Sequence, residues 1–193
     1  TGEGDTFDGN YAYYYTSGFY GGAIYGSTGA TITLTDSTLT SNVAYGGGAI
    51  YGTSIDSLSI TGGEVSDNTS YYSGGGILIS GADGVTFDGT LFDGNNAYYG
   101  YGGAAYVYYY TPMTVTDTSL ASNTAYYSGG AIYATTLYDT ATISGSTFDG
   151  NRTTYGSGGA IHLTTASDAL ISDSTFTDNS TYYDGGAIYS AYY

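Results

Sequence analysis

Two side chains in this sequence carry the groups most often used for cationic or acid–base catalysis, and each occurs once. Arg152 is the only cation, because the chain has no lysine, and His162 is the only histidine. Enzymes that hydrolyse glycosidic bonds need paired carboxylates about 5 to 9 Å apart, and the corresponding lyases need a cationic base with bound calcium. Neither Arg152 nor His162 has a partner base or nucleophile nearby in sequence. We therefore expect no catalytic residue and no enzymatic activity.

Seventeen acidic residues offer oxygen ligands, and most are aspartates in Asp-Gly, Asp-Asn or Asp-Ser pairs such as Asp93-Gly94 and Asp178-Asn179. These dipeptides are typical of turns. A column of aspartates that binds Ca²⁺ is the alternative. However, the Gly-Gly-x-Gly-x-Asp nonapeptide of calcium-binding repeats does not occur in the sequence. We expect no metal site and no cofactor, with Ca²⁺ as the minor alternative.

Asparagine recurs at one position of a short motif, three residues after a Phe, Leu or Val. The seven copies are Asn10, Asn42, Asn68, Asn95, Asn123, Asn151 and Asn179. Asparagine suits a turn because it tolerates left-handed backbone, and stacked copies can hydrogen-bond to one another as a ladder. Asn68, Asn151 and Asn179 also begin Asn-x-Ser/Thr sequons and are candidate glycosylation sites. Burial in a ladder would compete with that modification.

A second motif, a glycine pair followed by small and aliphatic residues and often by Tyr, alternates with the asparagine motif. Its copies begin at Gly21, Gly47, Gly75, Gly102, Gly129, Gly158 and Gly185, at intervals of 26 to 29 residues. A fixed period of this length indicates stacked units, each unable to bury its apolar face alone.

Between the motifs, apolar residues recur at spacings of two, as in Ile32 and Leu34 or Leu58 and Ile60. Such alternation predicts strands, and the clusters of Gly, Asp, Asn and Ser between them predict turns. About 27 residues, with three short strands and three turns, would form one coil of a parallel β-helix, and coils stack about 4.8 Å apart. We predict an all-β, single-stranded parallel β-helix of about seven coils. Residues 1–193 would form one domain with incomplete coils at both ends.

The strand after each glycine pair is expected to place an aliphatic side chain in the core. This inward column would be Ile24, Ile50, Leu78, Ala105, Ile132, Ile161 and Ile188. The following residues would form an outward aromatic column of Tyr25, Tyr51, Tyr106, Tyr133 and Tyr189, with Ile79 and His162 at the other two places. A second tyrosine band lies between the Asn and the glycine pair, at Tyr71-Tyr72, Tyr98-Tyr99, Tyr126-Tyr127 and Tyr182-Tyr183. These tyrosines either stiffen the surface or form an adhesive, carbohydrate-stacking face.

The negative charge of the chain excludes some classes of binding partner. The formal net charge of −16 excludes nucleic acid as a natural partner, because phosphate binding needs a cationic surface. It also argues against attachment to anionic lipid. No apolar run reaches the length of a membrane span, so we expect no membrane insertion. The chain has no cysteine and therefore no disulfide.

The alternation of Gly-Gly-Ala-Ile with Phe-x-x-Asn resembles the repeat of the chlamydial polymorphic outer-membrane proteins and of bacterial and archaeal surface proteins that share it. Residues 129–132 with 148–151, and 185–188 with 176–179, match that repeat in full. The resemblance covers the whole chain. It implies a right-handed parallel β-helix at a cell surface or outside the cell, with a role in adhesion and no catalytic residue. The high tyrosine content and the lack of lysine differ from that family.

Two functions fit these observations. The first is a structural subunit of an extracellular filament, in which β-helices of identical chains stack head to tail. The alternative is an adhesin-type binding module that recognises a glycan, a cell surface or a host protein through tyrosine-rich faces. A solitary solenoid normally needs capping repeats, and no cap sequence is visible at either end. The end of one copy joined to the start of the next would complete a coil of 29 residues, within the observed interval. We therefore expect the filament.

We predict that acid favours association. Lowering the pH to about 4 neutralises carboxylates, and the self-repulsion that arises from a net charge of −16 falls with them. Light scattering of the purified chain during an acid titration should increase. Dissolution of assemblies on acidification would contradict the prediction.

Overall fold

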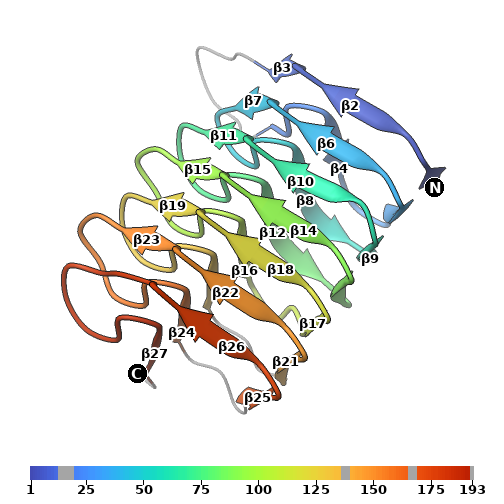
Figure 1. The fold of residues 1–193 in the computed structure, drawn as a ribbon. Helices are drawn as coiled ribbons and strands as arrows, with labels where there is room; N and C mark the ends of the chain where they lie inside the picture. Colours follow the sequence, from blue (N-terminus) through green and yellow to red (C-terminus); the bar gives the residue numbers. More distant parts are fainter. Residues whose placement is uncertain (13–19, 136–139, 165–168, 192–193) are drawn as a thin grey trace.

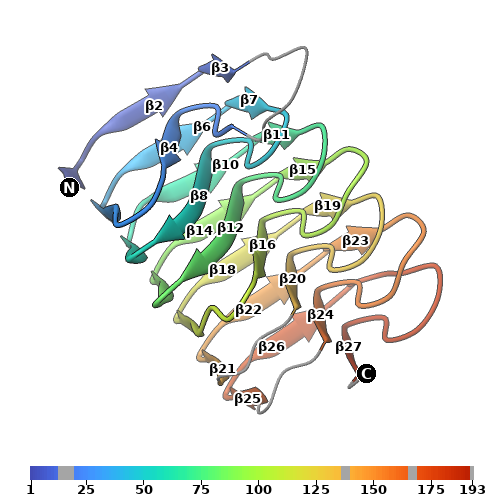
Figure 2. The same cartoon turned by 180° about the vertical axis from the view of Figure 1, so that it is seen from behind.

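The computed structural model describes residues 1–12, 20–135, 140–164 and 169–191, and these residues form strands and turns without a helix. The chain winds as a solenoid, and each turn lies beside the previous one from the N-terminus to the C-terminus (Figures 1 and 2). In the described residues no helix is long and apolar enough to cross a membrane. The all-β parallel solenoid expected from the repeat is confirmed.

The turns of the solenoid contribute strands to four parallel sheets, which we call A to D; sheets A, B and D have seven strands and sheet C has six. Sheet A contains β1 (Gly2–Glu3), β5 (Thr31–Thr35), β9 (Ser57–Thr61), β13 (Val85–Asp88), β17 (Met113–Thr116), β21 (Ala141–Ser144) and β25 (Ala169–Ser172). Sheet B contains β2 (Thr6–Asp8), β6 (Thr38–Thr40), β10 (Glu64–Ser66), β14 (Leu91–Asp93), β18 (Ser119–Ala121), β22 (Thr147–Asp149) and β26 (Thr175–Thr177).

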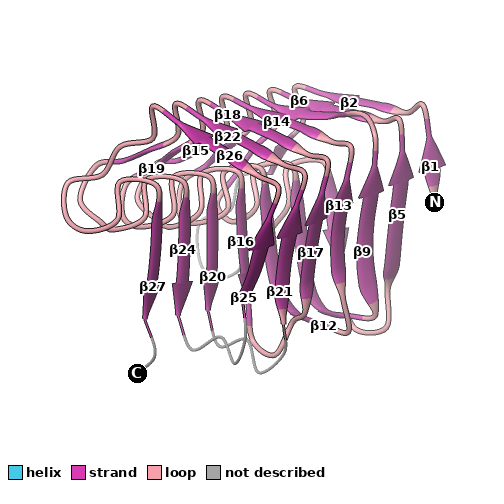
Figure 3. Cartoon of the chain, turned by 60° about the horizontal axis from the view of Figure 1, so that its bottom comes forward, coloured by secondary structure: helices cyan, strands magenta, loops and turns pink. Residues whose placement is uncertain are grey.

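The other two sheets follow the asparagine and glycine motifs. Sheet C contains β3 (Tyr11–Ala12), β7 (Val43–Ala44), β11 (Thr69–Ser70), β15 (Asn96–Ala97), β19 (Thr124–Ala125) and β23 (Arg152–Thr153). Sheet D contains β4 (Ile24–Gly26), β8 (Ile50–Ile55), β12 (Ile77–Ala82), β16 (Ala105–Tyr108), β20 (Ile132–Thr135), β24 (Ile161–Thr164) and β27 (Ile188–Ala191). Figure 3 shows the strands of sheets A and D side by side, with the two termini at opposite ends of the stack.

Two details of the expected coil differ in the structure. A turn has four strands rather than three, because the two residues after each of the first six motif asparagines form the short strands of sheet C. Two residues are too few to show an alternating pattern in the sequence. From the first glycine motif to the last the chain makes six complete turns, slightly fewer than the seven expected from the number of motif copies.

The core consists of columns of like side chains, since parallel pairing places each residue beside its equivalent in the next turn. The apolar residues of the asparagine motif form one column on sheet B, where Leu39, Val65, Phe92, Leu120 and Phe148 are fully buried. The Ile32/Leu34-type pairs of sheet A face them and are also buried. The inward positions predicted from the alternation in sheets A and B are therefore confirmed.

In sheet D the third copy of the glycine motif has a different register from the one expected. Ile77, not Leu78, pairs with Ile50 and Ala105, so Ile77 belongs to the inward column. Leu78 instead pairs with Tyr51 and Tyr106, and Ile79 is a fully buried core residue rather than an outward one. Three consecutive glycines precede this strand, and the pair that matches Gly47-Gly48 is Gly74-Gly75 rather than the second pair.

The second glycine of each pair allows a close approach of backbones between turns. At Gly75, whose φ is not in the left-handed region, a Cβ would lie 2.2 Å from the Gly103 carbonyl oxygen and 2.6 Å from the Asn96 backbone. Gly48, Gly103, Gly130 and Gly159 have the same kind of surroundings. Glycine is therefore required at this position of each turn, because the backbone of the next turn occupies the space that a Cβ would need.

We predict that Gly75→Ala lowers the free energy of unfolding by about 2 kcal/mol or more, because the added methyl group overlaps backbone atoms. The matched control is Gly84→Ala, where a Cβ would meet nothing within 4 Å and φ is not left-handed. That variant should keep or gain stability, within about 1 kcal/mol, because alanine restricts the unfolded chain. Denaturant unfolding measures both variants, and equal losses would contradict the packing argument.

Candidate functional site

The seven motif asparagines stack in the turn between sheets B and C and hydrogen-bond from one turn to the next. In every asparagine but the last, the Nδ2 group donates to the Oδ1 atom of the following asparagine at 2.8 to 3.0 Å. The backbone N–H of the same residue donates to the same Oδ1 atom at 2.9 to 3.2 Å. From the second asparagine onward, Nδ2 also donates backward to a carbonyl oxygen of the previous turn.

This network explains why the position requires asparagine. The residue before the Asn, not the Asn itself, adopts the left-handed backbone, as at Ser41, Asp67 and Ser122. The Asn is therefore needed for its amide, which donates one hydrogen to the following turn and one to the previous turn, while its oxygen accepts from the previous turn. Buried amides of this kind are stabilising only when every group is paired. No buried side-chain polar atom in the described residues lacks a partner.

The sequons occupy this ladder. Asn68 and Asn151 are fully buried with their amides engaged, while Asn179 is partly exposed. An oligosaccharyl group cannot be attached to a buried amide without displacing its hydrogen bonds. Glycosylation of these asparagines stays a prediction, and the folded chain opposes it most strongly at Asn68 and Asn151.

The column of Tyr25, Tyr51, Tyr106, Tyr133 and Tyr189 lies on the face of sheet D opposite the core, but it is largely covered. Of these tyrosines only Tyr25 is exposed, and Tyr51 is buried. Leu78 takes the tyrosine position in the third turn and interrupts the column. The expected exposed aromatic face is therefore not here.

The loop that contains Tyr101 covers part of this column. The Tyr101 ring lies 4.7 Å from the Tyr133 ring and 6.1 Å from the Tyr106 ring, between centroids. Burial raises the pKa of the Tyr106 phenol, and the neighbouring Tyr133 adds to the effect. Tyr101 stands alone between Gly100 and Gly102, so the sequence pattern of tyrosine pairs did not single it out.

His162 continues the covered column. Its ring lies 4.7 Å from both Tyr133 and Tyr189, and its Nδ1 donates to the Ser157 carbonyl oxygen at 3.1 Å. Burial lowers the pKa of the imidazole. Arg152, by contrast, is exposed in β23 of sheet C, so the two residues that could have served catalysis lie in different sheets.

A second set of tyrosines forms an exposed row of contacting rings, on the loops that join sheets C and D. We call the following six residues the tyrosine row: Tyr71, Tyr98, Tyr99, Tyr126, Tyr155 and Tyr182. All are exposed except Tyr126, which is half-buried. Their rings contact one another from turn to turn at centroid distances of 5.1 to 6.5 Å. Tyr155 follows Thr154 rather than another Tyr, so the sequence pattern missed it, although its place between Asn151 and Gly158 was a usable signal.

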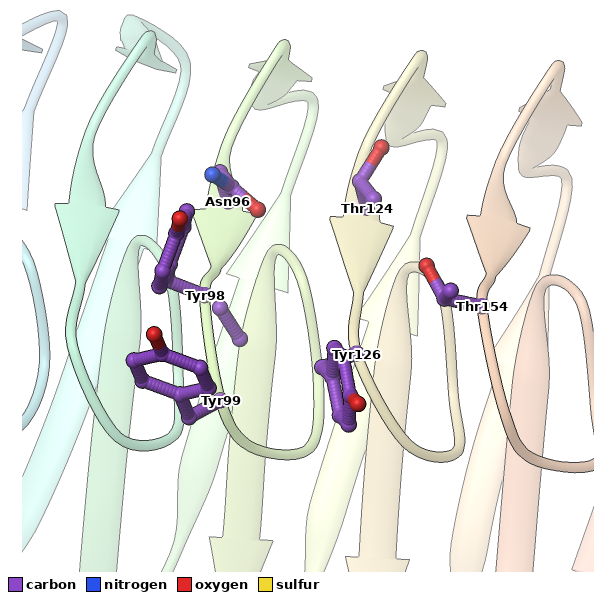
Figure 4. A pocket seen from close by; sticks show the side chains of 7 residues that line it. Asn96, Tyr98, Tyr99, Thr124, Tyr126 and Thr154 are labelled. Carbon is purple, nitrogen blue, oxygen red and sulfur yellow. The ribbon is translucent and has the colours of Figure 1, made fainter.

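A shallow hollow of about 300 Å³ lies within this row. Figure 4 shows Tyr98 and Tyr99 on one turn and Tyr126 on the next, with Asn96 and Thr124 above them. A similar hollow one turn further on is lined by Arg152, Thr154 and Tyr182. Aromatic rings beside amide, hydroxyl and guanidinium groups can stack on and hydrogen-bond to hydroxyl-rich ligands.

The aspartates behave as turn residues in the structure. Asp36, Asp67, Asp117, Asp173 and Asp178 have left-handed φ angles of 47° to 53°. Within the described ranges no group of three or more His, Cys, Asp or Glu residues is arranged to hold a metal ion.

Comparison with known proteins identifies one family. A family model described as a right handed beta helix region matches residues 17–192, which is nearly the whole chain. No curated protein and no solved structure matches the chain.

We predict that Asn95→Ala lowers the free energy of unfolding by about 3 kcal/mol or more. The change leaves two donors of Asn68 and the Val65 carbonyl oxygen without their partners, and each buried unpaired group costs about 1–3 kcal/mol. The control is Asn96→Ala, in which the neighbouring amide on the outer surface is removed. That change should cost less than about 0.5 kcal/mol.

The same position gives a test that is specific for donor groups. Asn95→Asp places a carboxylate among acceptors at neutral pH, and protonation restores one donor. Its loss of stability relative to the parent should therefore shrink as the pH falls toward about 4. Denaturant unfolding at several pH values measures this, and a pH-independent deficit would contradict the ladder as the cause.

Proposed function

This chain belongs to the right-handed β-helix family, and from that premise we propose that it is a structural subunit of an extracellular filament built by head-to-tail stacking of identical chains. The proposal assigns no catalytic residue, metal or cofactor, and the partner is a second copy of the chain. The resemblance of the repeat to that of polymorphic outer-membrane proteins supports a place at or outside the cell surface. That the only histidine is covered in an aromatic stack supports a role without enzymatic activity.

The observation that carries the proposal is the direction of the asparagine ladder. Every internal asparagine accepts through Oδ1 from the preceding turn and donates to the following turn. Within the described residues the Oδ1 atom of Asn10 accepts no hydrogen bond, and Asn179 donates only backward, to the Phe148 carbonyl oxygen. A second copy would place an Asn10 acceptor beside the Asn179 donors, and the internal contact would be repeated at the junction.

The outer turns are also complementary in their apolar residues. Phe176 stacks on Phe148 with parallel rings 4.7 Å apart, and Phe176 is only partly buried. Phe7, at the same position of the first turn, and the pair Ile24 and Ile188 are likewise partly buried. A head-to-tail contact would put Phe7 on Phe176 and Ile24 on Ile188, so that apolar surface leaves water on both sides. Such a contact is heterologous and does not close, which gives an open fibre.

The alternative, an adhesin-type module that binds glycans or a host surface, is favoured by one observation. The tyrosine row is exposed and contains hollows lined by both aromatic and polar side chains. The experiment described next distinguishes the two functions, because the filament requires self-association and the adhesive module does not.

We predict that the purified chain forms fibres whose axial repeat is about 34 Å per copy, from the six complete turns of one copy and the one turn completed at each junction, at about 4.8 Å per turn. Phe7→Glu should abolish them, because it buries a carboxylate in the junction. Thr6→Glu is the matched control, since it adds the same charge on the exposed side of the same strand and should still assemble. Electron microscopy and sedimentation measure the outcome. A parent chain that stays monomeric at high concentration, or fibres from Phe7→Glu, would contradict the proposal; a monomer retained on a glycan-coated surface would favour the adhesive module.

A further inference from the structure

The chain contains 27 tyrosines but no cysteine and no lysine. Its side chains therefore cannot form disulfides or lysine-based cross-links, whereas two tyrosine phenols can be joined by oxidation. We propose that the tyrosine row is a site of oxidative cross-linking, in which phenol rings of successive turns are coupled as dityrosine. The inference does not depend on filament assembly, because the coupled rings belong to one chain.

The geometry places reactive rings from different turns in contact. The centroids of Tyr126 and Tyr155 lie 5.1 Å apart, and those of Tyr99 and Tyr126 and of Tyr155 and Tyr182 lie 6.0 Å apart. Such pairs need only side-chain rotation to bring two ring carbons together, since the hydrogen-bonded strands hold the turns in register. A bond between them would join two turns of the solenoid from outside.

Exposure separates most of the row from the column on sheet D, although Tyr126 is half-buried. Tyr99, Tyr155 and Tyr182 are 57%, 51% and 67% exposed, so an oxidant in solution reaches their hydroxyl groups. The column on sheet D has rings equally close together, but Tyr51 is buried, and Tyr106 and Tyr133 are partly covered by the Tyr101 loop. Coupling should therefore favour the row over that column.

The reaction needs an external one-electron oxidant, and hydrogen peroxide with a peroxidase supplies it. Each phenol loses one electron and one proton to give a phenoxyl radical, and two radicals form a carbon–carbon bond between the ring positions next to the hydroxyl groups. The hydrogen on each of these carbons then moves to the oxygen, which restores two phenols. The two electrons and two protons reduce one peroxide to two waters.

One contact can be read directly by proteolysis. Arg152 is the only trypsin site in the 193 residues, so complete digestion of the unfolded chain gives two fragments. Among the tyrosine contacts of the described residues, Tyr126–Tyr155 spans this site. A dityrosine at that pair would keep the two fragments covalently joined under denaturing conditions.

The experiment oxidises the dilute, folded chain with peroxidase and hydrogen peroxide, then denatures it, digests it with trypsin and separates the products on a denaturing gel. We expect joined fragments with dityrosine fluorescence, and mass spectrometry should locate the link at Tyr126 and Tyr155. An undigested sample on the same gel identifies links between chains, which would double the mass.

Single Tyr→Phe variants make the test specific, because they keep the ring and remove the phenol. Tyr155→Phe and Tyr126→Phe should lose the joined product. Tyr127→Phe is the matched control, because its exposed ring contacts Tyr126 and Tyr101 but none of the described tyrosines beyond Arg152; it should keep the joined product. Separate fragments from the oxidised parent, or joined fragments from Tyr155→Phe, would overturn the proposal.

Discussion

The described strands of successive turns hydrogen-bond to one another in parallel register, so each strand residue lies beside the residue at the same position one turn earlier. A side chain at a repeated position therefore packs against copies of itself. Aliphatic residues satisfy this condition by contact, and asparagine satisfies it because its amide both donates and accepts along the same line. Glycine satisfies it where two backbones are too close for a Cβ. The two sequence motifs mark these positions, because other residues could not make the amide hydrogen bonds or would not fit between the two backbones.

The columns of the core could be predicted because alternation and repeat length determine which residues face inward. Leu39, Val65, Phe92 and Phe148 follow this rule. The register of the third turn of sheet D could not be predicted in the same way. Gly74, Gly75 and Gly76 offer two possible pairs, and the loop before them varies in length from turn to turn. Backbone hydrogen bonds of Gly75 and Ile77 select the register, and these are not visible in a pattern of residue types.

The placement of the tyrosines could likewise be predicted only in part. The positions of most tyrosines in the repeat could be predicted, Tyr101 and Tyr155 excepted, but not which of the two sets is covered. Tyr133 points away from the core and is nevertheless shielded, because Tyr101 of the previous turn folds over it. That contact depends on the path of a loop between two glycines, and sequence alone carries little information about such a path. His162 was correctly placed in this column, but its burial and its bond to Ser157 depend on the same kind of loop.

The asparagine ladder also gives the solenoid a direction. All of its amides point the same way, so one end face of any stack of turns presents acceptors and the other presents donors. Two chains cannot join through like faces, because acceptors would then meet acceptors. The end faces of this fold therefore cannot form the two-fold symmetric, isologous interface that is commonest among homodimers. A dimer with two-fold symmetry would have to form through the sides of the solenoid, and any growth along the axis would have a defined polarity.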